Sequence, residues 1–167
     1  TLGMKHNPDL LLQLALQCRA NPQEVVVVIS EGIGADWLKA RVQEHGLTNL
    51  ILLPYQPFSV LPQVLAAGDV LIAVLEEDAG VFSVPSKVLT YLCAARPLLL
   101  AVPPVNLAAR IIHEQRAGLT VPPSDTAAFL AAAQTLASHA ETAAAMAANA
   151  RAYAQAKADG GRVEDTD

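Results

Sequence analysis

The sequence is poor in charged and aromatic side chains, and both shortages narrow the class of protein. Charged residues make up 16% of the 167 residues and aromatic residues 4%, whereas hydrophobic residues make up 53%. A chain this apolar can fill a core, which excludes disorder over most of its length. The net charge of −5 and the lack of a long basic run argue against nucleic acid as a partner. The length suits one domain or one lobe of a larger protein.

Cysteine is also scarce, and the two present, Cys18 and Cys93, belong to no metal-ligand spacing. Both lie in apolar helical patterns, which indicates buried thiols in a reducing compartment rather than a disulfide. No apolar run reaches the ~20 residues that cross a bilayer. No signal peptide is visible at Thr1, and the opening TLGMKH lacks an initiator Met, so we expect a fragment of a longer, cytoplasmic protein.

Apolar runs alternate with amphipathic patterns along the chain. The runs predict strands at residues 25–30, 50–54, 70–75, 97–102 and 119–122. Stretches with apolar residues at helical spacing lie between them, and a helical pair follows the last strand. Runs without polar alternation are typical of strands covered on both faces. The βαβα order therefore predicts an α/β fold: a Rossmann-like doubly wound parallel sheet in three layers, α/β/α.

The expected boundaries follow from the same patterns. Residues 1–158 should form a single lobe, with a polar tail at 159–167. The TLG at residues 1–3 resembles the end of a further, central strand whose body would precede Thr1. Ser124 or Asp125 should cap the alanine-rich helix that follows the last strand.

Ligands of such sheets bind outside the carboxyl ends of the strands. The loops of interest are therefore 31–36, 54–58, 76–87 and 103–106. The third loop enters a helix at Ser86, where unpaired amides and the helix dipole favour phosphate or carboxylate. Ser86 offers a hydroxyl and Lys87 a full charge, while Gly80 allows close backbone approach. An ordinary serine-capped helix with a solvated lysine is the alternative.

The spacing of apolar residues also predicts which side of this helix is buried. A buried stripe should fix the helix and keep its anion-binding end rigid. The residues expected in this stripe are Val88, Leu89, Leu92 and Cys93.

The stretch PSKVLTYLCAARPLL, at 85–99, resembles the signature of GT-B glycosyltransferases of the family 4 type (glycosyl transferases group 1). It is most similar to members that build bacterial cell-surface polysaccharides. TLGMKHNP at 1–8 resembles the opening of the family's C-terminal lobe. Residues 53–75 resemble the middle section of that lobe. AGLTVPPSD at 117–125 resembles its close. The likeness covers about residues 1–155, in the family's order.

The resemblance implies the nucleotide-sugar donor lobe of a two-lobed enzyme. It implies a glycosyltransferase that moves a sugar from a nucleotide-diphosphate sugar to a cell-surface polysaccharide or glycolipid precursor, without a cofactor or metal. Its partners would be the nucleotide-diphosphate sugar and an N-terminal acceptor lobe, through which peripheral membrane contact would occur. The lobe alone should lack turnover.

The resemblance also assigns residues. Lys5 and Lys87 would neutralise the diphosphate and serve as the catalytic pair. The other donor-binding residues would be Tyr55, Gln56, Gly80, Val81, Phe82, Ser83, Pro85, Ser86, Val88 and Thr90. Tyr55 and Gln56 would lie near the base, and the loop from Gly80 to Ser83 against the sugar. Many members have a glutamate for the ribose at the position of Thr90 and an acidic residue near Phe82. This chain lacks both.

Three other patterns have weaker meanings. GIG at 32–34 invites a dinucleotide interpretation, but Trp37 stands where the third glycine of the motif belongs, which favours a tight strand-to-helix turn. The consecutive acids of 76–78 favour a solvated loop over a metal site. His6, next to Lys5, is a candidate phosphate contact. Two rival functions stay open: a nucleotide-sugar epimerase lobe, and a non-enzymatic binding or scaffold domain.

Overall fold

The computed structural model describes residues 1–82 and 84–163 as an α/β fold in which all strands run parallel. Strands β1 (Val26–Ile29) and β2 (Leu50–Leu53) form one sheet. Strands β3 (Leu71–Val74), β4 (Leu98–Ala101) and β5 (Gly118–Val121) form the other, in the order β3-β4-β5. Each strand lies within one residue of a predicted run. Two ladders replace the single expected sheet, because β1 and β3 do not pair within the described residues.

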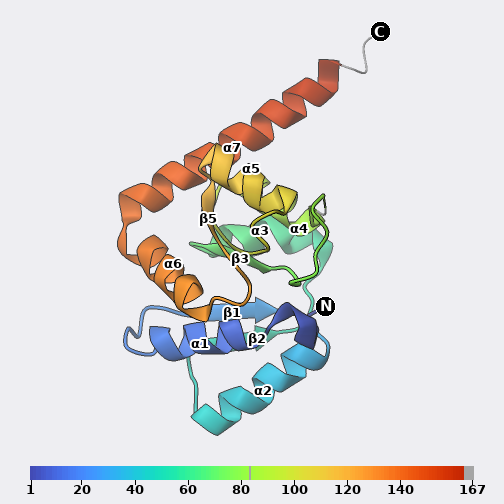
Figure 1. Cartoon of the computed structure of the whole chain (residues 1–167). Coiled ribbons are helices and arrows are strands. Elements are labelled where there is room, and N and C mark those ends of the chain that lie inside the picture. Colours follow the sequence, from blue (N-terminus) through green and yellow to red (C-terminus); the bar gives the residue numbers. More distant parts are fainter. Residues whose placement is uncertain (83, 164–167) are drawn as a thin grey trace.

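Helices cover the strands as the alternation predicts (Figure 1). The α-helices are α1 (Asp9–Cys18), α2 (Ile33–His45), α3 (Leu61–Ala67), α4 (Ser86–Cys93), α5 (Leu107–Gln115), α6 (Thr126–Ser138) and α7 (Ala140–Val163). Short 3-10 turns are η1 (Met4–His6) and η2 (Phe58–Val60). Asp125 caps α6 by accepting a bond from the Ala128 amide at 2.9 Å, which confirms one of the two predicted caps.

Two clusters of buried side chains form the core. One spans both sheets and includes Leu38, Leu99 and Phe129, each fully buried. The other packs α4 and α5 against β3 and β4, and Ala150 of α7 belongs to it. All four residues of β4 are buried, as expected for a strand covered on both faces.

Strand β1 contradicts the expectation of burial on both faces. Its pattern alternates, and Val27 is 51% exposed while Val26 and Val28 are buried. Ile51 of β2 is exposed beside it in the ladder, since Val27 pairs with Ile51. A continuous apolar run indicates that a strand can be covered on both faces. The elements that cover it must come from elsewhere in the fold, and within the described residues none packs over this face.

Helix α4 exposes more of its expected stripe than predicted. Val88 and Leu92 are buried, but Leu89 is 47% exposed and Cys93 is exposed. In an eight-residue helix that packs along one narrow line, positions one residue away from that line rotate about 100° towards solvent. Cys93 is therefore not a buried thiol. Cys18 is partly buried, and burial raises the pKa of its thiol to about 11.

Helix α7 continues through Val163, so residues 159–163 are helical where a polar tail was expected. It packs against α4, α5 and α6, and its far end extends beyond the other elements (Figure 1). Each further residue of a helix adds a hydrogen bond to an existing ladder, which lets a helix run on without tertiary support. Among the described residues, no helix combines the length and apolarity needed to cross a bilayer.

Candidate functional site

The first residues lie against the loop that follows β1. The Leu2 amide donates to the Glu31 carbonyl at 3.0 Å, and the Gly34 amide donates to the Leu2 carbonyl at 2.9 Å. A Cβ on Gly34 would come within 2.8 Å of that carbonyl oxygen, and Gly32 has a φ of +111°. The glycines of GIG thus serve a tight turn and a close approach of two backbones.

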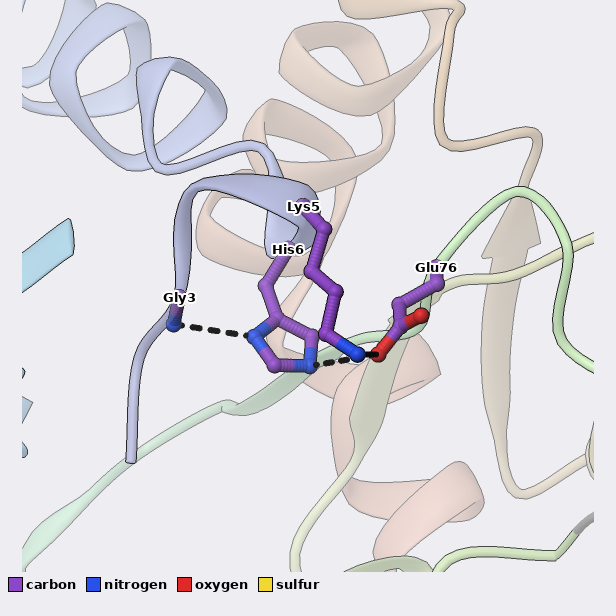
Figure 2. A network of polar contacts seen from close by, with 4 residues as sticks. All are labelled: Gly3, Lys5, His6 and Glu76. Carbon is purple, nitrogen blue, oxygen red and sulfur yellow. Dashed lines mark hydrogen bonds and ion pairs between the residues drawn. The ribbon is translucent and has the colours of Figure 1, made fainter. Parts of the chain in front are cut away.

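This packing directs η1 towards the end of β3, where Glu76 gathers two basic side chains (Figure 2). Lys5 Nζ lies 2.7 Å from Glu76 Oε1, and His6 Nε2 lies 3.3 Å from the same oxygen. The Gly3 amide donates to His6 Nδ1 at 3.1 Å. Because Nδ1 accepts this bond, the ring proton belongs on Nε2, which faces the carboxylate.

The pair shifts both titrations. The hydrogen bond to Glu76, followed by its charge, raises the pKa of Lys5. The same bond from Lys5 lowers the pKa of Glu76. Lys5 is 68% exposed and Glu76 26%, so the carboxylate is the more fixed partner.

Helix α4 begins next to this network. Pro85 is its N-cap and its first residues are Ser86 and Lys87. The Val88 amide donates to the Pro85 carbonyl at 2.9 Å, and the Thr90 hydroxyl donates to the Ser86 carbonyl at 3.0 Å. The Val88 amide is therefore already used. The amides of Ser86 and Lys87 are the ones that no carbonyl within the helix can satisfy.

Two adjoining pockets open here. The first, of about 350 Å³, is lined by His6, Leu75, Glu76, Asp78, Ala79, Pro85 and Lys87. The second, of about 480 Å³, is lined by Met4, Lys5, Asn7, Glu76, Glu77, Asp78 and Pro123. Glu76 and Asp78 line both, so the Lys5–Glu76 pair stands at the boundary between them. We call the first the Lys87 pocket and the second the Lys5 pocket.

The loop that precedes α4 is tied to α5 by Asn106, which sequence reasoning missed. This side chain is fully buried, and its Nδ2 donates to the Gly80 carbonyl at 2.6 Å. Its Oδ1 accepts from the Ala108 amide at 2.8 Å, and the Leu107 amide donates to the Val81 carbonyl at 2.6 Å. An Asn directly before a helical pattern predicts an N-cap, but it does not predict the second hydrogen bond of that side chain, to the Gly80 carbonyl.

The described residues predicted near the base and the sugar do not line the Lys87 pocket. Tyr55 bonds through its hydroxyl to Thr1 Oγ1 at 2.8 Å, and Gln56 donates to the Pro54 carbonyl at 2.9 Å. Neither lines either pocket. Val81 and Phe82 are exposed on the loop and line neither pocket. The predicted contact at Ser83 lies outside the described residues.

The architecture defines the class: a Rossmann-like α/β lobe with cationic side chains gathered beyond the carboxyl ends of its strands. The family model described as "Glycosyl transferases group 1" matches residues 2–139, and the chain belongs to that family. A comparison with curated proteins gives no match.

Solved structures agree on the fold. HepE of Anabaena, in complex with UDP-glucose, superposes with a TM-score of 0.75 at 18% identity, covering 92% of this chain and 41% of that one. WaaG, a glycosyltransferase involved in lipopolysaccharide biosynthesis, gives 0.68 at 20% identity, covering 92% and 39%. Sucrose-phosphate synthase of Thermosynechococcus elongatus gives 0.66 at 19%, covering 88% and 37%. The chain therefore spans less than half the length of these proteins.

Proposed function

We propose that this chain is the donor lobe of a glycosyltransferase and that the Lys87 pocket receives the diphosphate of a nucleotide-diphosphate sugar. The observation that carries the proposal is the position of Lys87, in the first turn of α4, in a pocket at the end of β3. Membership of the family and the UDP-glucose bound by HepE support the choice of ligand. The acceptor we propose is a precursor of a cell-surface polysaccharide or glycolipid, and the involvement of WaaG in lipopolysaccharide biosynthesis supports this choice.

The proposed chemistry is electrostatic. Transfer breaks the bond between the sugar's anomeric carbon and the diphosphate oxygen, and the electron pair stays on the diphosphate. The amides of Ser86 and Lys87, the Ser86 hydroxyl and the Lys87 ammonium would stabilise that charge. Lys5 would add a second ammonium. The Val88 amide is not among the proposed donors to the diphosphate, because the Pro85 carbonyl already accepts its hydrogen bond.

The acceptor and the remaining catalytic groups would come from another lobe, since the chain covers only 41% of HepE. We expect this chain to bind nucleotide diphosphate but to show no transfer by itself. An epimerase lobe would need an acid/base pair in the cleft. Glu76 and His6 line the Lys87 pocket, but they contact each other, and Glu76 is also paired with Lys5.

Calorimetric titration of the full chain with UDP and GDP tests the proposal. One of the two should bind, and Lys87→Ala should weaken that binding about tenfold, the loss of one charge-assisted contact. Lys39→Ala is the matched control, because Lys39 lies on α2 and, among the described residues, forms an ion pair with exposed Asp36 alone. A scaffold domain predicts no binding of either nucleotide. Equal affinity in the wild type and in Lys87→Ala would remove Lys87 from the site.

A further inference from the structure

Glu76 occupies a place that does not fit a simple anion site. Its carboxylate pairs with Lys5 (Figure 2), and the same residue lines the Lys87 pocket, whose ligand is proposed to be an anion. Asp78 lines the same pocket, and Glu77 lines its neighbour. Lys87 has no ion-pair partner among the described residues, whereas Lys5 is already neutralised. Among the described residues of this site, Lys87 therefore supplies the ammonium that no carboxylate neutralises.

A diphosphate next to Lys87 would meet repulsion from Glu76 and Asp78 at short range. Lys5 lines the neighbouring pocket and not the Lys87 pocket, so it can relieve this repulsion only by leaving Glu76. This movement costs Lys5 little free energy, because its flexible side chain is 68% exposed and its exposed ion pair is weak. Glu76 cannot move as easily, since it directly follows Leu75 at the buried end of β3.

We propose that Glu76 is an internal anion that holds Lys5 at the edge of the Lys87 pocket while the pocket is empty and yields Lys5 to the incoming diphosphate. The inference rests on the proposed function and adds a positioning residue that lowers nucleotide affinity. Ligand release benefits in return, because Glu76 takes Lys5 back as the diphosphate leaves. His6 keeps its orientation through Gly3, so the exchange needs only the Lys5 side chain to move.

Glu76→Gln and Glu77→Gln form a matched pair for the test. Each removes one negative charge from the same loop and keeps the side-chain shape. Glu77 lines the Lys5 pocket but has no ion pair among the described residues. By calorimetry with UDP or GDP, whichever binds, Glu76→Gln should tighten binding roughly threefold, the size of an exposed ion pair that no longer competes. Glu77→Gln should change it by less than about 1.5-fold.

Repeating the comparison in Lys5→Ala isolates the exchange. Without Lys5 only the direct repulsion between Glu76 and the diphosphate remains, so the advantage of Glu76→Gln over Glu77→Gln should be smaller than it is with Lys5 present. A second readout follows Lys5 directly: in reductively ¹³C-methylated protein, the Lys5 signal should shift on addition of nucleotide. A carboxylate with a structural role alone would leave that signal in place.

The outcomes separate the two proposals. If Lys87→Ala weakens binding but Glu76→Gln is no tighter than Glu77→Gln, or the Lys5 signal stays fixed, Glu76 is not a competitor and only this inference is overturned. If the folded wild type binds neither nucleotide, the donor-lobe proposal and this inference both fail. Tighter binding in Glu76→Gln that depends on Lys5 supports both.

Discussion

The two sheets of this lobe differ in how completely they are covered. In the three-stranded sheet every residue of β4 is buried, whereas the two-stranded sheet exposes Val27 and Ile51 on one face. The site draws on both halves. Glu76 and Lys87 belong to the β3–β5 half, and Lys5 precedes α1, which packs on β1. The Lys5–Glu76 ion pair therefore joins a well-packed half to a more open one, and the more open half supplies the side chain that is proposed to move.

Truncating one apolar residue in each half should show the largest contrast. Leu99→Ala in β4 removes a fully buried side chain from the shared core and should lower the free energy of unfolding by about 3 kcal/mol. Val27→Ala in β1 should cost about 0.5 kcal/mol, because half of that side chain already contacts solvent. Urea unfolding of the full chain measures both. Equal losses would mean that the open face of β1 is covered in solution.

Loss of the buried loop anchor should have the next largest effect. Asn106→Ala leaves the Gly80 carbonyl and the Ala108 amide without their partner and should cost about 2 kcal/mol. Asp125→Ala removes an exposed cap of α6 and should cost about 1 kcal/mol. Asn106→Ala should also weaken nucleotide binding, because the loop entering α4 loses its tie, while Asp125→Ala should not. If Asp125→Ala weakened nucleotide binding more than Asn106→Ala, the loop would be held by contacts other than those of Asn106.

The two thiols should differ in their rate of labelling. Cys93, exposed at the end of α4, should react with a disulfide reagent at pH 8 at least about tenfold faster than Cys18. Burial, followed by a hydrogen bond and charge repulsion from Glu24, raises the pKa of Cys18 to about 11, so little thiolate is present. Cys93→Ser and Cys18→Ser each leave one thiol and assign the two rates. Similar rates would place Cys18 in a more open environment.

The smallest expected effect is the pH dependence of the ion pair. Because Lys5 lowers the pKa of Glu76, the pair should persist below the usual range of a glutamate and be lost as pH falls through that lowered value. At the alkaline end it should be lost as pH rises through the raised pKa of Lys5. An NMR titration of the Glu76 carboxyl carbon should move its midpoint upward in Lys5→Ala. An unchanged midpoint would mean that the two groups are apart in solution.

Much of the fold could be predicted because it is written in local patterns. Apolar runs place all five of the described strands, and the Asp125 cap and the α4 start at Ser86 follow from short-range hydrogen-bonding rules. The exposure of Val27 could not be predicted, because a strand's sequence does not say which elements reach each face.

The candidate site was predictable in part, for the same physical reason. The PSK stretch located Lys87 at the mouth of a helix. The partner of Lys5 lies 71 positions away, and the carbonyl held by Asn106 lies 26 positions away. Only packing fixes such contacts. The Thr90 hydroxyl bonds to the Ser86 carbonyl within its own helix, a contact that the sequence alone did not reveal.

The position of α7 affects how this lobe should be cut for experiments. The family match ends at residue 139, one residue before α7 begins, yet α7 packs along α4 and its Ala150 is fully buried in the cluster that holds Val88 and Leu92. A gene trimmed at the family border would encode a protein whose anion-facing helix has lost its backing. Such a product would be expected to stick to itself through the uncovered side of α4, and a failure to bind nucleotide would then say nothing about the pocket.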